Sequence, residues 1–324
     1  MTTLIYDIAA ESGGALIILK MYHQKAMANA NENERYVFVV SIPHLEENEY
    51  VKVLNFPKIK KSWFHRYFFD KKADKKLIEK YKPDLIINLQ NVAINTDCEQ
   101  VLYMHQPLPF IEQKFSLFRD PLLWVYQNII GGMIKKSIKK VSKVIVQTKW
   151  TKDAILKKVK VSEDKITIET PEIDLSHVKS RKGDIKKGIY FYPASAVKYK
   201  NHKVIVEACK LLENENIFYE VNFTLLGNEN KYISKLKKQT EKYCLKINWL
   251  GNLEWNEIFE WYSKSTLIFP SYVETFGLPL VEAAAGYSPV LAADTPFAKE
   301  LLGEYSNVVF FKYNNEKELA ELMK

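Results

Sequence analysis

Short apolar runs alternate with longer amphipathic stretches along most of the chain. Apolar runs rich in Val, Ile and Phe are typical of buried strands, and stretches with an apolar residue every three or four positions are typical of helices. In the first half of the chain this pattern predicts strands at 3–8, 37–41, 51–54, 85–88, 100–104, 143–147 and 166–168, and helices at 15–30, 70–81, 122–140 and 150–158.

The same alternation starts again at Gly188. It predicts strands at 189–192, 221–226, 247–250, 266–269, 289–292 and 308–311, and helices at 202–213, 232–243, 255–263 and 279–285. Strands that alternate with helices are typical of doubly wound parallel sheets. We therefore predict an α/β fold of two Rossmann-like domains, residues 1–175 and 188–324, with a polar linker at 176–187.

Several residues suited to ligand binding come directly after predicted strands. Ligands of doubly wound sheets bind outside the carboxyl ends of the strands. We therefore expect the two domains to face each other across one shared cleft. The residues that follow strands in this way are Gly13, His105, Ser195, Gly227 and Glu274.

The composition is that of a globular protein, with 47% hydrophobic and 27% charged residues in a chain of 324. Cys98, Cys209 and Cys244 are widely spaced, which argues against a disulfide framework or a zinc site and fits a reducing compartment. The N-terminus lacks the basic region of a signal peptide. The longest uncharged apolar-rich run, 121–134, is shorter than the roughly 20 residues that span a bilayer. We expect a cytoplasmic protein.

The net charge of +8 lies entirely within residues 1–170, where basic residues gather at Lys58–Lys72 and Lys135–Lys140. Trp63, Phe64 and Phe68 interleave with the first cluster, a composition that suits contact with an anionic membrane surface at the inner face of the cell membrane. It would also suit RNA, but no nucleic-acid module accompanies it, so we expect no such partner. A solvated lysine-rich face with aromatics in the core is the third interpretation.

The segment Phe269–Ala283 carries the most specific chemistry. An apolar run stops at Pro270, and Glu274 follows before a helix that is entered through Pro279 and contains Glu282. Free amides at a helix N-terminus bind anions, and glycine lets a ligand approach the backbone. Two carboxylates beside such amides suit a sugar nucleotide. An ordinary strand–loop–helix connection with two solvated glutamates is the alternative.

This segment resembles the Glu–seven residues–Glu signature of retaining glycosyltransferases of the GT-B fold, in particular family 4 of the "glycosyl transferases group 1" type. Phe276-Gly277-Leu278-Pro279 inside the segment matches, as does Tyr199-Lys200-Asn201-His202 upstream. Gly13-Gly14 is similar to the family's N-terminal glycine loop, and Tyr103–Pro107 lies where the family has a histidine that faces the sugar. The resemblance covers nearly the whole chain.

The resemblance implies a retaining transferase that moves a sugar from a nucleotide-diphosphate-sugar to a glycan or lipid-linked acceptor, as in capsule or O-antigen synthesis. It implies catalytic roles for Glu274 and His105, and a base contact for Glu229 or Asn228. The donor-binding residues that it implies are Gly13, Gly14, Ser195, Lys198, Lys200, Gly227, Leu250, Thr275, Phe276, Gly277, Leu278 and Glu282. A GT-B nucleotide-sugar epimerase and a non-catalytic, membrane-docked binding subunit are the alternatives.

The metal-binding residues and two departures from the family's pattern complete this picture. The chain has no Asp-x-Asp pair, so Lys200 and helix amides would neutralise the leaving diphosphate, and we expect no metal and no cofactor. Family members usually have an arginine about six residues before the lysine, where this chain has Ala194 or Ser195. Lys198 is a candidate substitute, although a lysine lacks the guanidinium fork. The family's final crossover helix is missing or short.

Overall fold

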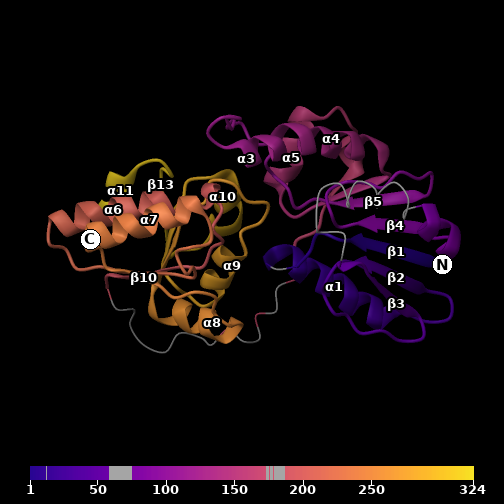
Figure 1. Ribbon diagram of the computed structural model, residues 1–324, viewed down its shortest axis with the longest axis horizontal. Helices are drawn as coiled ribbons and strands as arrows, with labels where there is room; N and C mark the ends of the chain where they lie inside the picture. The colour runs from indigo at the N-terminus through magenta and orange to yellow at the C-terminus, as the bar shows by residue number, and fades with distance from the viewer. Residues whose placement is uncertain (12, 58–74, 173–174, 176–177, 179–186) are drawn as a thin grey trace. The chain divides into compact units, whose positions relative to one another are not determined.

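The computed structural model describes residues 1–11, 13–57, 75–172, 175, 178 and 187–324. The described chain forms two compact units, Met1–Glu172 and Ile173–Lys324, each built on one parallel sheet (Figure 1). The boundary falls three residues before the predicted linker, 176–187, most of which lies outside the described residues. The cluster Lys58–Lys72 lies outside them as well, and the helix predicted at 70–81 is described, as a helix, only at 75–81.

Unit 1 contains a seven-stranded parallel sheet in the order β3-β2-β1-β4-β5-β6-β7. Figure 1 shows β5, β4, β1, β2 and β3 side by side in this order. The strands are β1 (Thr2–Asp7), β2 (Arg35–Val40), β3 (Val51–Asn55), β4 (Leu85–Asn88), β5 (Glu99–Tyr103), β6 (Lys143–Val146) and β7 (Ile166–Ile168). The first helix is α1 (Gly13–Asn29), and the last is α5 (Lys149–Lys158). A short 3₁₀ turn, η3 (Glu163–Lys165), precedes β7.

The core of unit 1 lies on both faces of this sheet, which explains the continuous apolar runs of its strands. Ile5 packs with Ile18 and Leu19 of α1 on one face, and Leu4 and Tyr6 pack on the other. Each of these side chains is at most 2% exposed. Burial on alternating sides therefore fixes the register of β1 between β2 and β4.

The helix predicted at 122–140 is present but not regular. It consists of α3 (Pro121–Val125), a π-helical turn η2 (Tyr126–Ile130) and α4 (Gly131–Lys140). Gly131, which follows the π turn, lies against Pro109, so that a Cβ at this position would come within 3.0 Å of Pro109 Cβ. The sequence pattern did not predict this π turn.

Unit 2 contains a six-stranded parallel sheet in the order β10-β9-β8-β11-β12-β13. Its strands are β8 (Ile189–Tyr192), β9 (Glu220–Phe223), β10 (Ile247–Trp249), β11 (Thr266–Phe269), β12 (Val290–Ala293) and β13 (Val308–Phe311). Its helices are α6 (His202–Asn214), α7 (Lys231–Lys242), α8 (Trp255–Lys264), α9 (Leu278–Ala285), α10 (Pro296–Leu302) and α11 (Glu316–Leu322), with a 3₁₀ turn η4 (Lys198–Lys200) before α6.

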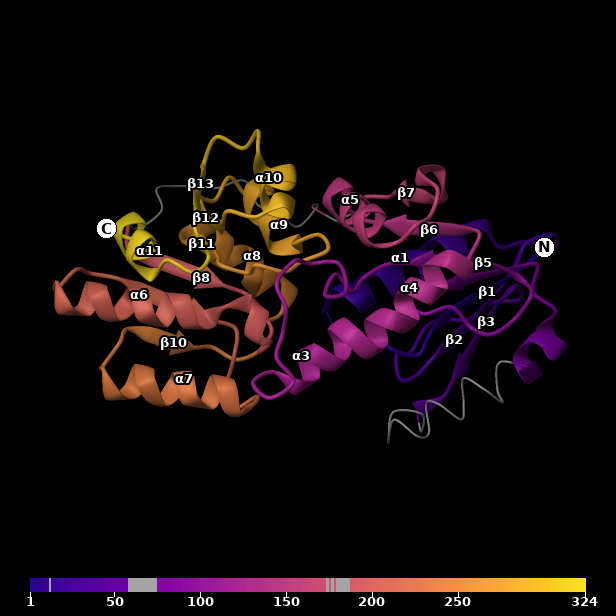
Figure 2. The same cartoon turned by 90° about the horizontal axis from the view of Figure 1, so that it is seen from above.

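Helices cover both faces of the second sheet. Figure 2 shows α6, α7 and α11 on one side and α8, α9 and α10 on the other, so the prediction of doubly wound parallel sheets is confirmed. The sequence pattern did not predict α10, a seven-residue helix that begins at Pro296. The last helix, α11, packs against α6 of its own unit.

The strand order creates one special position in each sheet. In unit 2, β8 and β11 are neighbours, although helices after β8 and β11 cover opposite faces. The loops that leave these two strands therefore diverge at the carboxyl edge of the sheet, which is where doubly wound sheets bind their ligands. In unit 1 the corresponding strands are β1 and β4. No helix of the described residues is long and apolar enough to cross a membrane.

Candidate active site

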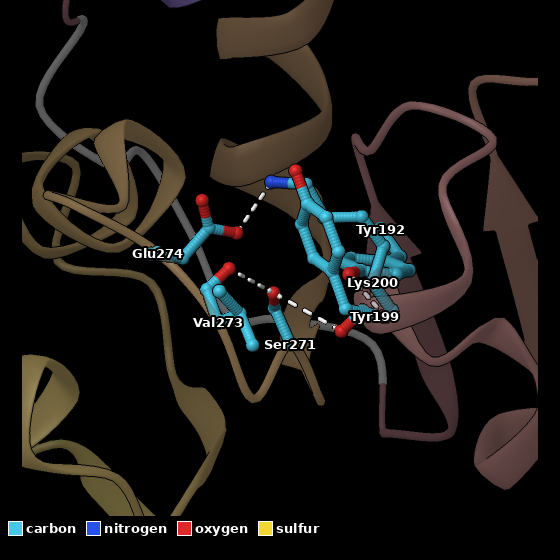
Figure 3. A network of polar contacts seen from close by, with 6 residues as sticks. All are labelled: Tyr192, Tyr199, Lys200, Ser271, Val273 and Glu274. Carbon is cyan, nitrogen blue, oxygen red and sulfur yellow. Dashed lines mark hydrogen bonds and ion pairs between the residues drawn. The ribbon is translucent and has the colours of Figure 1, made fainter. Parts of the chain in front are cut away.

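Two charged residues meet at the β8–β11 position of unit 2. Lys200 ends the 3₁₀ turn after β8, and Glu274 lies in the loop after β11. Lys200 Nζ and Glu274 Oε1 form an ion pair, and Figure 3 shows the two side chains pointing toward each other. Their side chains are only 16% and 15% exposed. Because little water screens the pair, the two side chains attract each other more strongly than an exposed ion pair would.

Backbone and hydroxyl groups hold the two loops together beneath this ion pair. The Tyr192 hydroxyl donates to the Lys200 carbonyl at 2.6 Å, and Tyr272 N donates to the Tyr199 carbonyl at 3.2 Å. Ser271 Oγ lies 3.4 Å from the Tyr199 carbonyl and 3.3 Å from the Val273 carbonyl (Figure 3). The lysine and the carboxylate are therefore positioned before any ligand binds.

Asn201 fixes the start of α6 directly after Lys200. Its backbone is left-handed, with φ +61°, and its side-chain amide donates to the Tyr313 carbonyl at 2.7 Å. The next residue, His202, is fully buried, and burial together with the charge of Lys200 lowers its pKa to about 3. His202 is therefore neutral at physiological pH and adds no positive charge beside Lys200.

The N-terminus of α9 follows the Glu274 loop. Gly277 occupies the N-cap position with φ +98°, a left-handed conformation that an L side chain would strain. A Cβ at this position would also come within 3.3 Å of Leu280 Cδ1. Glycine therefore allows the sharp entry into α9, whose first residues are Leu278 and Pro279. Thr275 is half-buried and Phe276 is buried in the same loop.

Glu282 lies inside α9, as predicted, but it is not solvated. It is 7% exposed, and its Oε2 accepts a hydrogen bond of 2.8 Å from the Tyr262 hydroxyl of α8. Burial raises the pKa of Glu282, and the Tyr262 hydrogen bond opposes that shift. Because Glu274 is also mostly buried, the alternative of two solvated surface glutamates does not describe this segment.

Replacing Tyr262 by Phe tests this arrangement. We expect a loss of about 1–3 kcal/mol in the free energy of unfolding near pH 7, because the buried Glu282 carboxylate loses its donor. The variant's Glu282 pKa rises further, so the loss is largest above that pKa and shrinks as falling pH protonates the carboxyl. Urea unfolding at about pH 7 and about pH 5 measures both. Tyr287→Phe, at a residue 67% exposed in the same unit, is the control, and an equal loss in the two variants would contradict the role of the hydroxyl.

The loop after β9 contains Gly227, Asn228 and Glu229, and Glu229 hydrogen-bonds within the loop itself. Gly227 adopts φ +90°, and both oxygens of Glu229 accept hydrogen bonds from this loop, from Leu226 N at 2.5 Å and Gly227 N at 3.1 Å. Glu229 therefore stabilises its own turn, while Asn228 is exposed. β9 ends at Phe223, three residues before the predicted end at 226. Leu250 is half-buried after β10, and its N–H donates to the Phe223 carbonyl at 2.9 Å.

The remaining candidates of unit 2 lie on the same loop as Lys200. Ser195 and Lys198 are exposed after β8, and Lys198 begins the 3₁₀ turn that Lys200 ends. The structure thus groups Ser195, Lys198 and Lys200 on one loop and Glu274, Thr275 and Phe276 on the neighbouring one. Tyr192, Ser271 and Tyr262, which orient the charged residues, were not predicted, because nothing in the sequence pattern distinguishes them from other strand, loop and helix residues.

In unit 1, Gly13 and His105 follow β1 and β5. Gly13 begins α1 with φ +63°, and Gly14 is the next residue of this helix. His105 N donates to Asn91 Oδ1 at 2.5 Å, which ties the loops after β5 and β4 together. Burial lowers the pKa of His105 to about 4, against the opposing effect of a hydrogen bond with the Leu89 backbone.

His105 is therefore neutral at physiological pH, and its Nε2 is buried without a hydrogen-bond partner among the described residues. Both ring nitrogens of His202 are also buried without a partner among the described residues. As for metals, the described ranges contain no group of three or more His, Cys, Asp and Glu side chains arranged to hold an ion.

Comparisons with solved structures identify the fold. Over 99% of this chain and 88% of the other, the structure superposes on sucrose-phosphate synthase from Thermosynechococcus elongatus with a TM-score of 0.78 at 13% identity. Anabaena HepE, solved in complex with UDP-glucose, gives a TM-score of 0.71 at 16% identity over 100% of this chain and 88% of the other. Both likenesses concern the fold, and the chain has the GT-B fold of glycosyltransferases.

Sequence comparisons relate the chain to glycosyltransferases. The family model "Glycosyl transferases group 1" matches residues 176–324, slightly less than half of the chain. The O-antigen chain mannosyltransferase RfbU of Salmonella typhimurium is 27% identical over 61% of this chain and 57% of its own length. The serotype-specific mannosyltransferase WbdA of Escherichia coli is 44% identical over 33% of this chain and 13% of its own length. The chain thus matches only part of the length of these two relatives.

Proposed function

We propose that the protein is a retaining glycosyltransferase of the family 4 type that transfers a mannosyl residue from a nucleotide-diphosphate-sugar to a glycan or lipid-linked acceptor of a cell-surface polysaccharide. One observation carries the proposal. A lysine and a carboxylate from two different loops meet at the β8–β11 position, next to the N-terminus of α9. The mannosyltransferases RfbU and WbdA, which share sequence with the chain, support mannose as the sugar.

The chemistry follows from the leaving group. Breaking the bond between the sugar and the diphosphate places negative charge on the diphosphate, and Lys200 with the amides at the start of α9 would neutralise it. Lys200 is paired with Glu274 in the structure. Donor binding would therefore give Lys200 the diphosphate as a partner, and would free the Glu274 carboxylate for sugar hydroxyls beside the reacting carbon.

Other residues would orient the donor. Glu282, which Tyr262 holds in α9, would accept hydrogen bonds from ribose hydroxyls. His105, neutral and with an unpaired Nε2, would bind a sugar hydroxyl. In a retaining reaction the acceptor attacks the face that the diphosphate leaves, and the leaving phosphate takes the acceptor proton. This route requires no side chain as general base.

A donor screen followed by product analysis tests the function. We expect one nucleotide-diphosphate-sugar to raise the melting temperature in a concentration-dependent way, with GDP-mannose compared with UDP-glucose and ADP-glucose. The same donor should then give an α-linked product with a glycan acceptor, as seen in the anomeric proton spectrum. Conversion of the donor alone to another sugar nucleotide would identify an epimerase instead. Binding without turnover on any acceptor offered would identify a binding subunit.

A further inference from the structure

Unit 1 exposes a concentrated set of large apolar side chains along α3, η2 and the start of α4. Single exposed apolar residues are normal, but contiguous ones mark interaction surfaces. Five of the fifteen large hydrophobic side chains exposed in the described part of the chain fall within residues 117–133, with exposed fractions between 46% and 94%. This apolar stripe consists of Leu117, Phe118, Leu122, Ile129 and Met133.

The stripe is held in place by the rest of unit 1. Gln127 in the π turn accepts a hydrogen bond from Phe115 N at 3.0 Å and donates to the Gln113 carbonyl at 2.6 Å. Phe115 and Leu123 are 7% and 8% exposed, so they anchor the same segment in the core. The outward direction of Phe118 and Leu122 is therefore set by the packing of their neighbours.

Basic side chains continue the stripe along the helix. Figure 2 shows α3 and α4 following one another along one line. Ile129, Met133 and Lys136 follow each other at helical spacings of four and three residues, which place them on one side of the helix. Lys136, Lys139 and Lys140 are exposed, and residues 111–140 contain six basic and two acidic side chains. We call Lys136, Lys139 and Lys140 the lysine patch.

We infer that the apolar stripe and the lysine patch dock unit 1 on the surface of an anionic lipid bilayer. An amphipathic helix lies in the plane of such a surface with its apolar side chains among the acyl chains and its lysines at the headgroups. The positive charge favours a bilayer over a second copy of this chain, whose stripe would carry the same charge. The inference rests on this surface and not on the proposed transfer, but a docked enzyme would reach a lipid-linked acceptor.

Vesicle co-sedimentation of the full chain tests the inference. We expect binding to phosphatidylcholine vesicles with about 30% phosphatidylglycerol at low salt, and weaker binding as salt shortens the screening length. Each lysine near an anionic surface contributes a factor of about five in affinity. The variant Lys136→Glu, Lys139→Glu and Lys140→Glu should therefore weaken binding by on the order of 100-fold. Phe118→Ser with Leu122→Ser should remove the part of the binding that persists at high salt.

Matched control variants distinguish the effect of this surface from the effect of net charge and from the effect of unfolding. Lys231→Glu, Lys235→Glu and Lys238→Glu change the net charge equally on exposed positions of α7, and Ile42→Ser removes an apolar side chain 58% exposed elsewhere on unit 1. Both should bind vesicles like the wild type, and every variant should keep the wild-type circular dichroism.

Three outcomes would overturn the inference. They are no binding to anionic vesicles at low salt, wild-type binding by the stripe and patch variants, and a dimer in sedimentation velocity that Phe118→Ser with Leu122→Ser dissociates.

Discussion

Replacing Glu274 by Gln should lower the rate of sugar transfer by about 100-fold or more while the fold persists. The amide has the shape of the carboxylate but lacks its charge, and Glu274 is the only negatively charged partner that the described structure gives to Lys200. In the proposed reaction this charge lies beside the sugar carbon as positive character develops there. The loss should therefore appear in kcat, and initial-rate kinetics with saturating donor would measure it.

The control for this variant is Glu304→Gln, at an exposed carboxylate of the same unit. It should leave both kcat and the melting temperature unchanged. Since Lys200 would lose its charged partner in Glu274→Gln, donor affinity should change far less than turnover, or even increase. A variant that turns over at a near-normal rate would show that Glu274 does not act in the transition state.

Replacing Lys200 by Ala should impair transfer by a similar factor, about 100-fold to 1000-fold, while an excess of chelator has little effect. Lys200 is the cation that the structure places beside Glu274, and the amide groups at the start of α9 would be left to neutralise the diphosphate alone. Stopped assays with and without chelator, for the wild type and the variant, measure both effects.

The Lys200→Ala variant also leaves a mostly buried Glu274 carboxylate without its partner, which by itself destabilises the fold. The double variant Lys200→Ala with Glu274→Ala removes both charges. Comparing its melting temperature with that of Lys200→Ala shows how much of the single variant's loss comes from destabilisation of the fold. Lys203→Ala, at an exposed lysine three residues along the chain, should be neutral. Full loss of wild-type activity in chelator, restored by Mg²⁺ or Mn²⁺, would contradict the proposed role of Lys200 in place of a metal.

The fold was largely predictable, because the strands of a doubly wound sheet are buried on both faces and so read as apolar runs. β11 at Thr266–Phe269 and β8 at Ile189–Tyr192 coincide with their predictions. The features that were missed depend on contacts elsewhere in the fold. The π turn at Tyr126–Ile130 lies where Gln127 binds the backbone of residues 108–115. The short helix α10 has too few residues for a clear apolar period.

In the candidate site, too, some features were predictable from the sequence and others depend on tertiary contacts. Glu274, Gly277 and Glu282 were predicted together because they belong to one motif in one segment. The two environments of the glutamates were not predictable, since one pairs with a lysine and the other with a tyrosine hydroxyl from α8. Glu229 is a third case. The resemblance implied a base contact for it or for Asn228, and the structure adds that its carboxylate binds the amides of its own turn.

The sequence by itself determined the alternation of strands and helices and the place of Glu274, Gly277 and Glu282 in one strand–loop–helix segment, because these depend on local backbone preferences and on short spacings. Only the tertiary structure decided that Lys200 and Glu274, 74 residues apart, form one ion pair, and that Glu282 is buried against Tyr262. Pairing of this kind depends on which strands become neighbours in the sheet. The burial of many side chains together sets that order, which no single stretch of sequence contains.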